Sequence, residues 1–169
     1  MEICIVKIKT NTMKTAKSLS PKNNNVMELS TKLNDLLANY QIYYQNLRGM
    51  HWNIKGPKFF ELHAKFEEFY TDALLKIDEI AERILTLGNQ PLHTFTDFVK
   101  QSEIREEKNI SDANKSIKLI IDNLSVLLKK ERELLGLSDK LNDEGTNSLM
   151  SDYIKEQEKT LWMLRAFIS

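Results

Sequence analysis

The stretch HWNIKGPKFFELHAKFEEFYTDALLKIDEIAER, residues 51–83, decides the fold of this protein. After the Gly56-Pro57 break, apolar residues recur every three or four positions, which is the period of one face of an α-helix. They are Phe59, Leu62, Phe66, Phe69, Leu74, Ile77 and Ile80, and Ile84 and Leu87 continue the series. The spacing predicts a helix from about Lys58 to Leu87, ended by Gly88.

Three more stretches show the same helical period. We expect these helices at about 26–52, from Ser111-Asp112 onward, and at about 146–168. The connection from Gly88 to Ile110 is long enough for a crossover, and Thr94–Val99 within it is predicted to form a short extra helix. With 5 glycines and 3 prolines in 169 residues, the chain is predicted to be all-α, with one four-helix bundle domain over residues 26–169.

Charge is unevenly distributed along the chain. The formal net charge is +0, yet residues 1–25 hold five lysines and one glutamate, a net +4, so the remainder carries −4. The lysines are Lys7, Lys9, Lys14, Lys17 and Lys22. Because polar residues dominate residues 1–25, we predict a disordered basic N-terminal tail there. Met13 is a second candidate start of the chain.

Cysteine usage and hydropathy indicate the cellular compartment. Cys4 is the only cysteine, so an intrachain disulfide is excluded. No apolar run is long enough to cross a bilayer, and Glu2 stands where a signal peptide would carry positive charge. We therefore predict a cytoplasmic protein.

Histidine and carboxylate residues occur at ligand-like spacing on the predicted second helix. His63 and Glu67 are four residues apart, as are Asp78 and Glu82, so each pair projects from one helix face. All four lie within about 100° around the helix. The midpoints of the two pairs are roughly 22 Å apart along the axis. One metal ion cannot bridge that distance, so each pair is half of a site.

A second copy of the helix would complete the site. If it is antiparallel, with a two-fold axis near residues 72–73, the His63 pair of one subunit faces the Asp78 pair of the other. His51 can approach the same cluster through the short Gly56-Pro57 turn. Imidazole nitrogen mixed with carboxylate oxygen suits Fe(II) or Zn(II) better than Ca(II). Polar pairs four residues apart are also common on solvated helices, so spacing alone leaves that alternative open.

Residues 51–83 resemble the signature of the Dps family, the ferritin-like DNA-binding proteins from starved cells. An H-W-N-x-K-G element begins at His51, a histidine follows twelve positions later at His63, and a D-x-x-A-E-R element begins at Asp78. The resemblance extends from about residue 27 to the end of the chain. It implies a ferritin-like four-helix subunit and a dodecameric shell.

The resemblance also implies an activity. Family members oxidise Fe(II), preferably with hydrogen peroxide, and store the ferric product, which protects against oxidative stress. The family's iron ligands, which come from two chains, correspond here to His51, His63 and Glu67 of one subunit and Asp78 and Glu82 of its mate. Trp52 is expected to be an electron donor near the site, with ordinary helix-end packing as the alternative. His93 has no expected role.

Two motifs differ from those of other iron proteins. Conventional ferritins build their site inside each bundle with an E-x-x-H motif, and no E-x-x-H occurs in this chain. Many Dps relatives carry a D-x-x-T-x-D pattern at the iron-entry pore. Asp143 and Thr146 match this pattern, but Ser148 replaces the final acid. Asp143 and Glu144 are therefore candidate pore residues only.

Two other hypotheses compete with iron oxidation. The five tail lysines predict non-specific DNA binding, strengthened by twelve copies in one shell, which would associate the protein with the nucleoid. The alternative for these lysines is a solvated tail. A purely structural shell with a degenerate metal site is the third hypothesis, and the intact ligand set argues against it. Peroxide and oxygen both stay open as the physiological oxidant.

Overall fold

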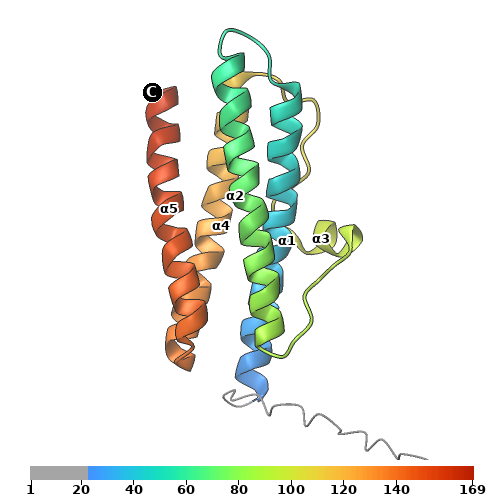
Figure 1. The fold of residues 1–169 in the computed structure, drawn as a ribbon, viewed down its shortest axis with the longest axis vertical. Helices are drawn as coiled ribbons and strands as arrows, with labels where there is room; N and C mark the ends of the chain where they lie inside the picture. The colour runs from blue at the N-terminus through green and yellow to red at the C-terminus, as the bar shows by residue number, and fades with distance from the viewer. Residues whose placement is uncertain (1–22) are drawn as a thin grey trace, which may run out of the picture.

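The computed structural model describes residues 23–169, which form five helices. They are α1 (Asn23–Asn53), α2 (Phe59–Thr86), α3 (Phe95–Gln101), α4 (Ala113–Leu141) and α5 (Glu144–Ile168) (Figure 1). No strand occurs within residues 23–169, and the predicted all-α class is confirmed. The five tail lysines lie outside the described residues.

Capping residues decide where the helices begin. The side chains of Asp112 and Asp143 each accept a hydrogen bond from a backbone N–H three residues further on, at the starts of α4 and α5. Because Asp143 is the cap, α5 begins two residues before the expected start at Thr146. α1 begins at Asn23 instead of Val26, so its first three residues belong to the helix and not to the predicted tail. A run of asparagines suits a helix start as well as a loop.

The four long helices pack as two antiparallel pairs, α1 with α2 and α4 with α5 (Figure 1). Between the pairs the chain leaves the end of α2, passes through α3 beside α1, and returns along the bundle to the start of α4 (Figure 1). α2 and α4 therefore run in the same direction. This is the predicted crossover, and α3 is the predicted short extra helix within it.

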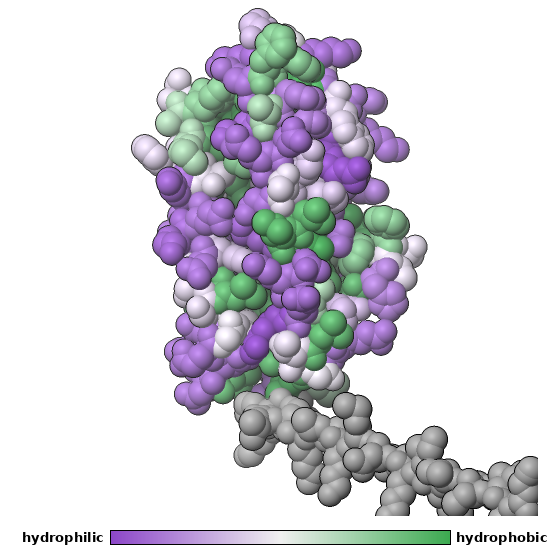
Figure 2. All heavy atoms as spheres, in the orientation of Figure 1, coloured by the Kyte–Doolittle hydropathy of each residue, from purple (hydrophilic) through white to green (hydrophobic). Residues whose placement is uncertain are grey.

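An apolar core lies between the long helices. On α2 the buried apolar residues include Leu62, Phe66, Ile80 and Ile84, all on the predicted apolar face. Leu74, which we also placed on that face, is 48% exposed because it lies at the edge of the apolar stripe. On the face shown in Figure 2, apolar patches are small and separated by hydrophilic side chains. None of the helices in residues 23–169 has the length and apolar composition needed to cross a bilayer.

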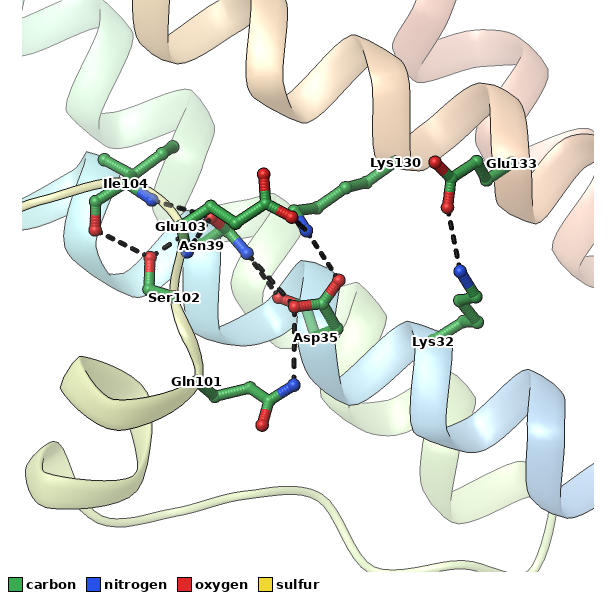
Figure 3. Close-up of polar contacts among 9 residues, drawn as sticks. All are labelled: Lys32, Asp35, Asn39, Gln101, Ser102, Glu103, Ile104, Lys130 and Glu133. Atoms are coloured by element: carbon green, nitrogen blue, oxygen red, sulfur yellow. Dashed lines mark hydrogen bonds and ion pairs between the residues drawn. The ribbon is translucent and has the colours of Figure 1, made fainter.

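A polar cluster fixes the long connection to the bundle (Figure 3). Lys130 of α4 is 6% exposed, and its ammonium group lies 2.7 Å from Asp35 of α1 and 2.6 Å from Glu103 of the connection. The Asn39 side-chain oxygen accepts hydrogen bonds from the backbone N–H groups of Glu103 and Ile104, at 3.0 and 3.1 Å. The crossover is thereby held against both α1 and α4.

Candidate metal centre

Two of the three histidines lie side by side where α1 meets α2. His51 is in the last turn of α1, and His63 is in the second turn of α2. Gly56 in the intervening turn has φ 103°, a conformation that favours glycine and lets the chain reverse within a few residues. The two imidazole rings stack with their centroids 3.7 Å apart and an interplanar angle of 19°. The predicted approach of His51 to α2 therefore occurs within a single subunit.

Hydrogen bonds determine which nitrogen of each ring carries the proton. Nδ1 of His51 lies 2.7 Å from the backbone carbonyl oxygen of His63, and Nδ1 of His63 lies 2.9 Å from that of His51. A carbonyl oxygen can only accept, so each Nδ1 carries the proton and donates it. A neutral ring then keeps its lone pair on Nε2, the form in which imidazole binds metal ions. Both Nε2 atoms are thus suited to be ligands.

Aromatic side chains pack against both rings. Phe59 stacks on His63, with ring centroids 5.1 Å apart at 19°. Tyr70 meets His51 edge-on, with ring centroids 5.3 Å apart at 84°. His51 is also 9% exposed. Because packing and hydrogen bonds already restrict the rings, little rotamer freedom remains to be lost when a metal ion binds.

Glu67 lies one helical turn after His63 and is exposed. Tyr70 lies a further three residues along α2 and is partly buried. Burial raises the pKa of Tyr70, and the nearby negative charge of Glu67 raises that pKa further. The phenol therefore stays protonated.

The other two predicted ligands lie further along α2. Asp78 and Glu82 are both exposed. Among residues 23–169, no three His, Cys, Asp or Glu side chains lie close enough together to hold one metal ion. One subunit thus brings His51 and His63 together but does not bring them to Asp78 and Glu82. The rise of an α-helix gives the physical reason, because it separates the two groups by roughly 22 Å.

Trp52 and His93 lie in different surroundings. Trp52 follows His51 and is 58% exposed, and the Arg48 guanidinium packs over its indole ring at 4.7 Å. His93 lies in the connection between α2 and α3 and is exposed. Its Nδ1 lies 3.0 Å from the carbonyl oxygen of Pro91. The structure therefore keeps His93 away from the candidate site.

The predicted pore residues stand at the turn between α4 and α5. Asp143 caps α5 and forms an ion pair with Arg83. Arg83 also donates from Nε to the Thr146 hydroxyl at 3.0 Å. A β-carbon at Gly145 would lie 2.9 Å from the guanidinium carbon, so a larger residue there would displace the Arg83 side chain. Asp143 is thus bonded within its own subunit, whereas Glu144 is exposed, and a pore role for either stays a prediction.

One polar cluster inside the bundle was missed by the sequence analysis. Glu131 is fully buried and accepts hydrogen bonds from the Tyr40 hydroxyl, at 2.7 Å, and from the Gln157 amide. Burial raises the pKa of Glu131 to about 7, although these two hydrogen bonds lower it. A signal was present in the sequence, because Glu131 and Gln157 stand on apolar helix faces, four residues after Leu127 and Tyr153.

Comparison with known proteins places these features in a family. Residues 30–169 match the model of the ferritin-like domain. A protein of Haemophilus influenzae is 52% identical over 82% of this chain and 87% of its own. The DNA protection during starvation protein of Porphyromonas gingivalis is 42% identical over 80% of this chain and 85% of its own.

A solved structure supports the same relationship. The crystal structure of the Dps protein from Vibrio cholerae, a member of a broad superfamily of ferritin-like diiron-carboxylate proteins, has a TM-score of 0.86 and 48% sequence identity to this chain. The match covers 91% of this chain and 100% of that one. This chain therefore belongs to the Dps family of the ferritin-like superfamily.

Proposed function

We propose that this protein oxidises Fe(II) at a site shared between two copies of the chain and stores the ferric product inside an assembled shell. The observation that carries the proposal is the hydrogen-bonded pair of His51 and His63, which leaves both Nε2 atoms free as ligands. Imidazole nitrogen combined with carboxylate oxygen binds Fe(II) well. Membership of the Dps family supports the same activity.

A second copy of the chain would supply the remaining ligands. Glu67 would join the histidines of its own subunit, while Asp78 and Glu82 would come from the mate. An antiparallel two-fold contact near residues 72–73 of α2 would produce two such sites per dimer. Leu74, Leu75 and Leu85 of α2 are 48%, 61% and 58% exposed. Exposed apolar side chains on this helix support a contact that covers them.

The proposed reaction takes two electrons per peroxide molecule. Two Fe(II) ions, bound as substrate, each give one electron, and hydrogen peroxide with two protons becomes two molecules of water. Carboxylates stabilise Fe(III) more strongly than Fe(II) because the attraction grows with the charge of the ion. The ligands would therefore favour the oxidised product. Trp52 would supply an electron to the site when a second Fe(II) ion is missing. Oxygen is the alternative to peroxide as the oxidant.

A dodecameric shell in the cytoplasm is the assembly that we propose for storage. The family resemblance supports it, and a hollow shell would keep the ferric product away from other molecules. Because the site needs two chains, assembly and oxidation would be linked.

Complementation between two inactive variants tests the shared site. His63→Ala and Asp78→Ala should each slow peroxide-dependent Fe(II) oxidation, because each removes one ligand from every site. In a hybrid dimer of the two variants, one site has lost both ligands and the other is intact. Random mixing should therefore restore about one site in four. Anaerobic Fe(II) loading followed by stoichiometric peroxide, with absorbance and peroxide consumption recorded, measures the recovery.

The control for this experiment is His93→Ala, which removes an exposed histidine far from the site and should leave the rate unchanged. If hybrids of His63→Ala and Asp78→Ala stay as slow as either variant alone, the two residues do not belong to one shared site.

DNA binding is the second candidate function. Five lysines and one glutamate give residues 1–25 a net charge of +4, and the Porphyromonas gingivalis relative is named for DNA protection during starvation. Lysines that neutralise phosphates release counterions, so such binding would be non-specific and sensitive to salt. Many tails on one shell would add avidity.

A further inference from the structure

Two adjoining cavities are lined mainly by α2 and α5. One has a volume of about 220 Å³ and the other of about 200 Å³, and Lys65, Phe69 and Met163 line both. We call the two cavities together the α2–α5 cleft. At roughly 100° per residue, Asp72 in this cleft lies about 180° around α2 from His63. The cleft is therefore on the other side of α2 from the proposed iron ligands.

One end of the cleft, nearer the start of α2, is apolar. Three helices contribute its apolar side chains, which are Leu62 and Phe69 of α2, Ile117 of α4, and Met163, Leu164 and Phe167 of α5. Leu62 and Ile117 are only 3% and 1% exposed, so this end is backed by the core of the bundle. Such a surface accepts the apolar body of a small ligand.

The other end of the cleft carries an excess of negative charge. Asp72 and Glu156 both line it, and both form ion pairs with the single ammonium group of Lys76, which lies 2.8 Å from Glu156. Lys65 is paired with Glu68, so one negative charge of the Asp72 and Glu156 pair is left without a cation. Burial raises the pKa of Asp72, and the negative charge of Glu156 raises it further against the opposing charge of Lys76. A second cation would stabilise these carboxylates.

Gln157 adds a buried acceptor to the same end. It lines the cavity beside Tyr40 and is 4% exposed. Its amide nitrogen donates to the Tyr40 hydroxyl and to Glu131. Within residues 23–169, its Oε1 atom is buried and finds no hydrogen-bond partner. Because a buried acceptor without a donor is costly, this end of the cleft lacks both a hydrogen-bond donor and a positive charge.

We propose that the α2–α5 cleft binds a small organic cation, in which a primary ammonium group is attached to an apolar body. The ammonium group would lie at Asp72 and Glu156, and the body would extend past Phe69 toward Leu62. An ammonium group has several N–H donors and no acceptor, which matches carboxylate and amide oxygens. Asp72 and Leu62 are roughly 15 Å apart along α2, a length that suits an alkyl chain. The site uses none of the proposed iron ligands, so it is independent of the proposed function.

Calorimetric titration of the assembled full-length protein with n-octylamine, below the concentration at which the amine forms micelles, tests the proposal. We expect saturable binding of one molecule per chain. Ethylamine keeps the ammonium group but lacks most of the apolar body, so it should bind at least about a hundredfold more weakly. 1-Octanol keeps the apolar body without the charge and should also bind more weakly. Octanol that binds as tightly as octylamine would overturn the assignment of a cationic ligand.

Two variants remove one carboxylate charge each. Asp72→Asn and Glu156→Gln should each bind octylamine roughly tenfold to a hundredfold more weakly, because a charged hydrogen-bond partner is lost. Thermal unfolding midpoints show whether either variant has kept its fold. Glu158→Gln is the matched control, since Glu158 of α5 pairs with Arg132 outside the cleft, and its octylamine affinity should be unchanged. Failure of the unaltered protein to bind octylamine, or equal binding by all four proteins, would overturn the proposed site.

Discussion

At the scale of single residues, Glu131 is the side chain whose charge depends most on the fold. It is fully buried, and burial raises its pKa from 4.5 to about 7. Among the described residues, Oε2 of Glu131 and Oε1 of Gln157 are buried without a hydrogen-bond partner. A proton on the free Glu131 oxygen adds a donor to a cluster that has too many acceptors. The buried carboxyl is therefore better accommodated in its neutral form.

This property predicts a pH-dependent stability. Between pH 4.5 and about 7 the folded protein keeps a proton on Glu131 that the unfolded chain has released. The resulting stabilisation is complete below about pH 4.5 and is absent above about pH 7. Across this range the free energy of unfolding should fall by roughly 3 kcal/mol. Glu131→Gln removes the titrating group.

Urea unfolding of both proteins from about pH 5 to about pH 8 measures the effect. The free energy of unfolding should fall more steeply with pH for the unaltered protein than for Glu131→Gln. The contributions of other titrating groups cancel when the free energies of unfolding of the two proteins are subtracted. Two parallel curves would therefore contradict a raised pKa for Glu131.

At the scale of secondary-structure elements, Asn39 of α1 holds the start of the segment that leads from α3 to α4. The side-chain oxygen of Asn39 accepts hydrogen bonds from the Ser102 hydroxyl and from the backbone N–H groups of Glu103 and Ile104, at 3.1, 3.0 and 3.1 Å. Ser102 and Ile104 are each 4% exposed, so solvent cannot replace these bonds easily. Residues 102–104 are thus held by a side chain more than sixty residues away in the sequence.

Asn39→Ala should release residues 102–104 from α1. It leaves buried donors without an acceptor, and we expect a loss of about 2–4 kcal/mol in the free energy of unfolding. Amide hydrogen exchange should quicken at 102–104 and stay slow in the middle of α2. Asn53→Ala is the control, since Asn53 is exposed and bonds to Gly49 of its own helix. Equal effects of the two substitutions would show that Asn39 does not anchor the connection.

At the scale of the whole molecule, opposite charges are separated along the chain. Residues 1–22 carry all five tail lysines and one glutamate, so the helical domain is left with −4. An acidic domain repels the phosphate backbone of DNA, and attraction has to come from the tail. In a shell, many tails could engage one DNA molecule.

Deleting residues 1–22, which leaves α1 complete, should abolish DNA retardation in a gel-shift titration and leave Fe(II) oxidation unchanged. Retardation by the full chain should weaken steeply between low and high salt, because phosphate contacts release counterions. A variant with glutamine at the five lysine positions controls for tail length. Equal DNA binding by the full and shortened chains would rule out the tail as the binding element.

The sequence by itself determined the helices and the two halves of the candidate site. Helical period and four-residue spacing are local properties, so the apolar face of α2 and the pairs His63–Glu67 and Asp78–Glu82 could be predicted without a fold. The sequence also showed that one helix cannot bring both pairs to a single metal ion, because helix rise sets the distance between the pairs.

Only the tertiary structure decided the chemical state of the groups within these elements. The protons of His51 and His63 are positioned by carbonyl oxygens twelve residues away, and Tyr70 meets His51 from another helix. The raised pKa of Glu131 follows from burial against residues of α1 and α5. Protonation and ring orientation depend on contacts between distant parts of the chain, which helical period and spacing do not encode.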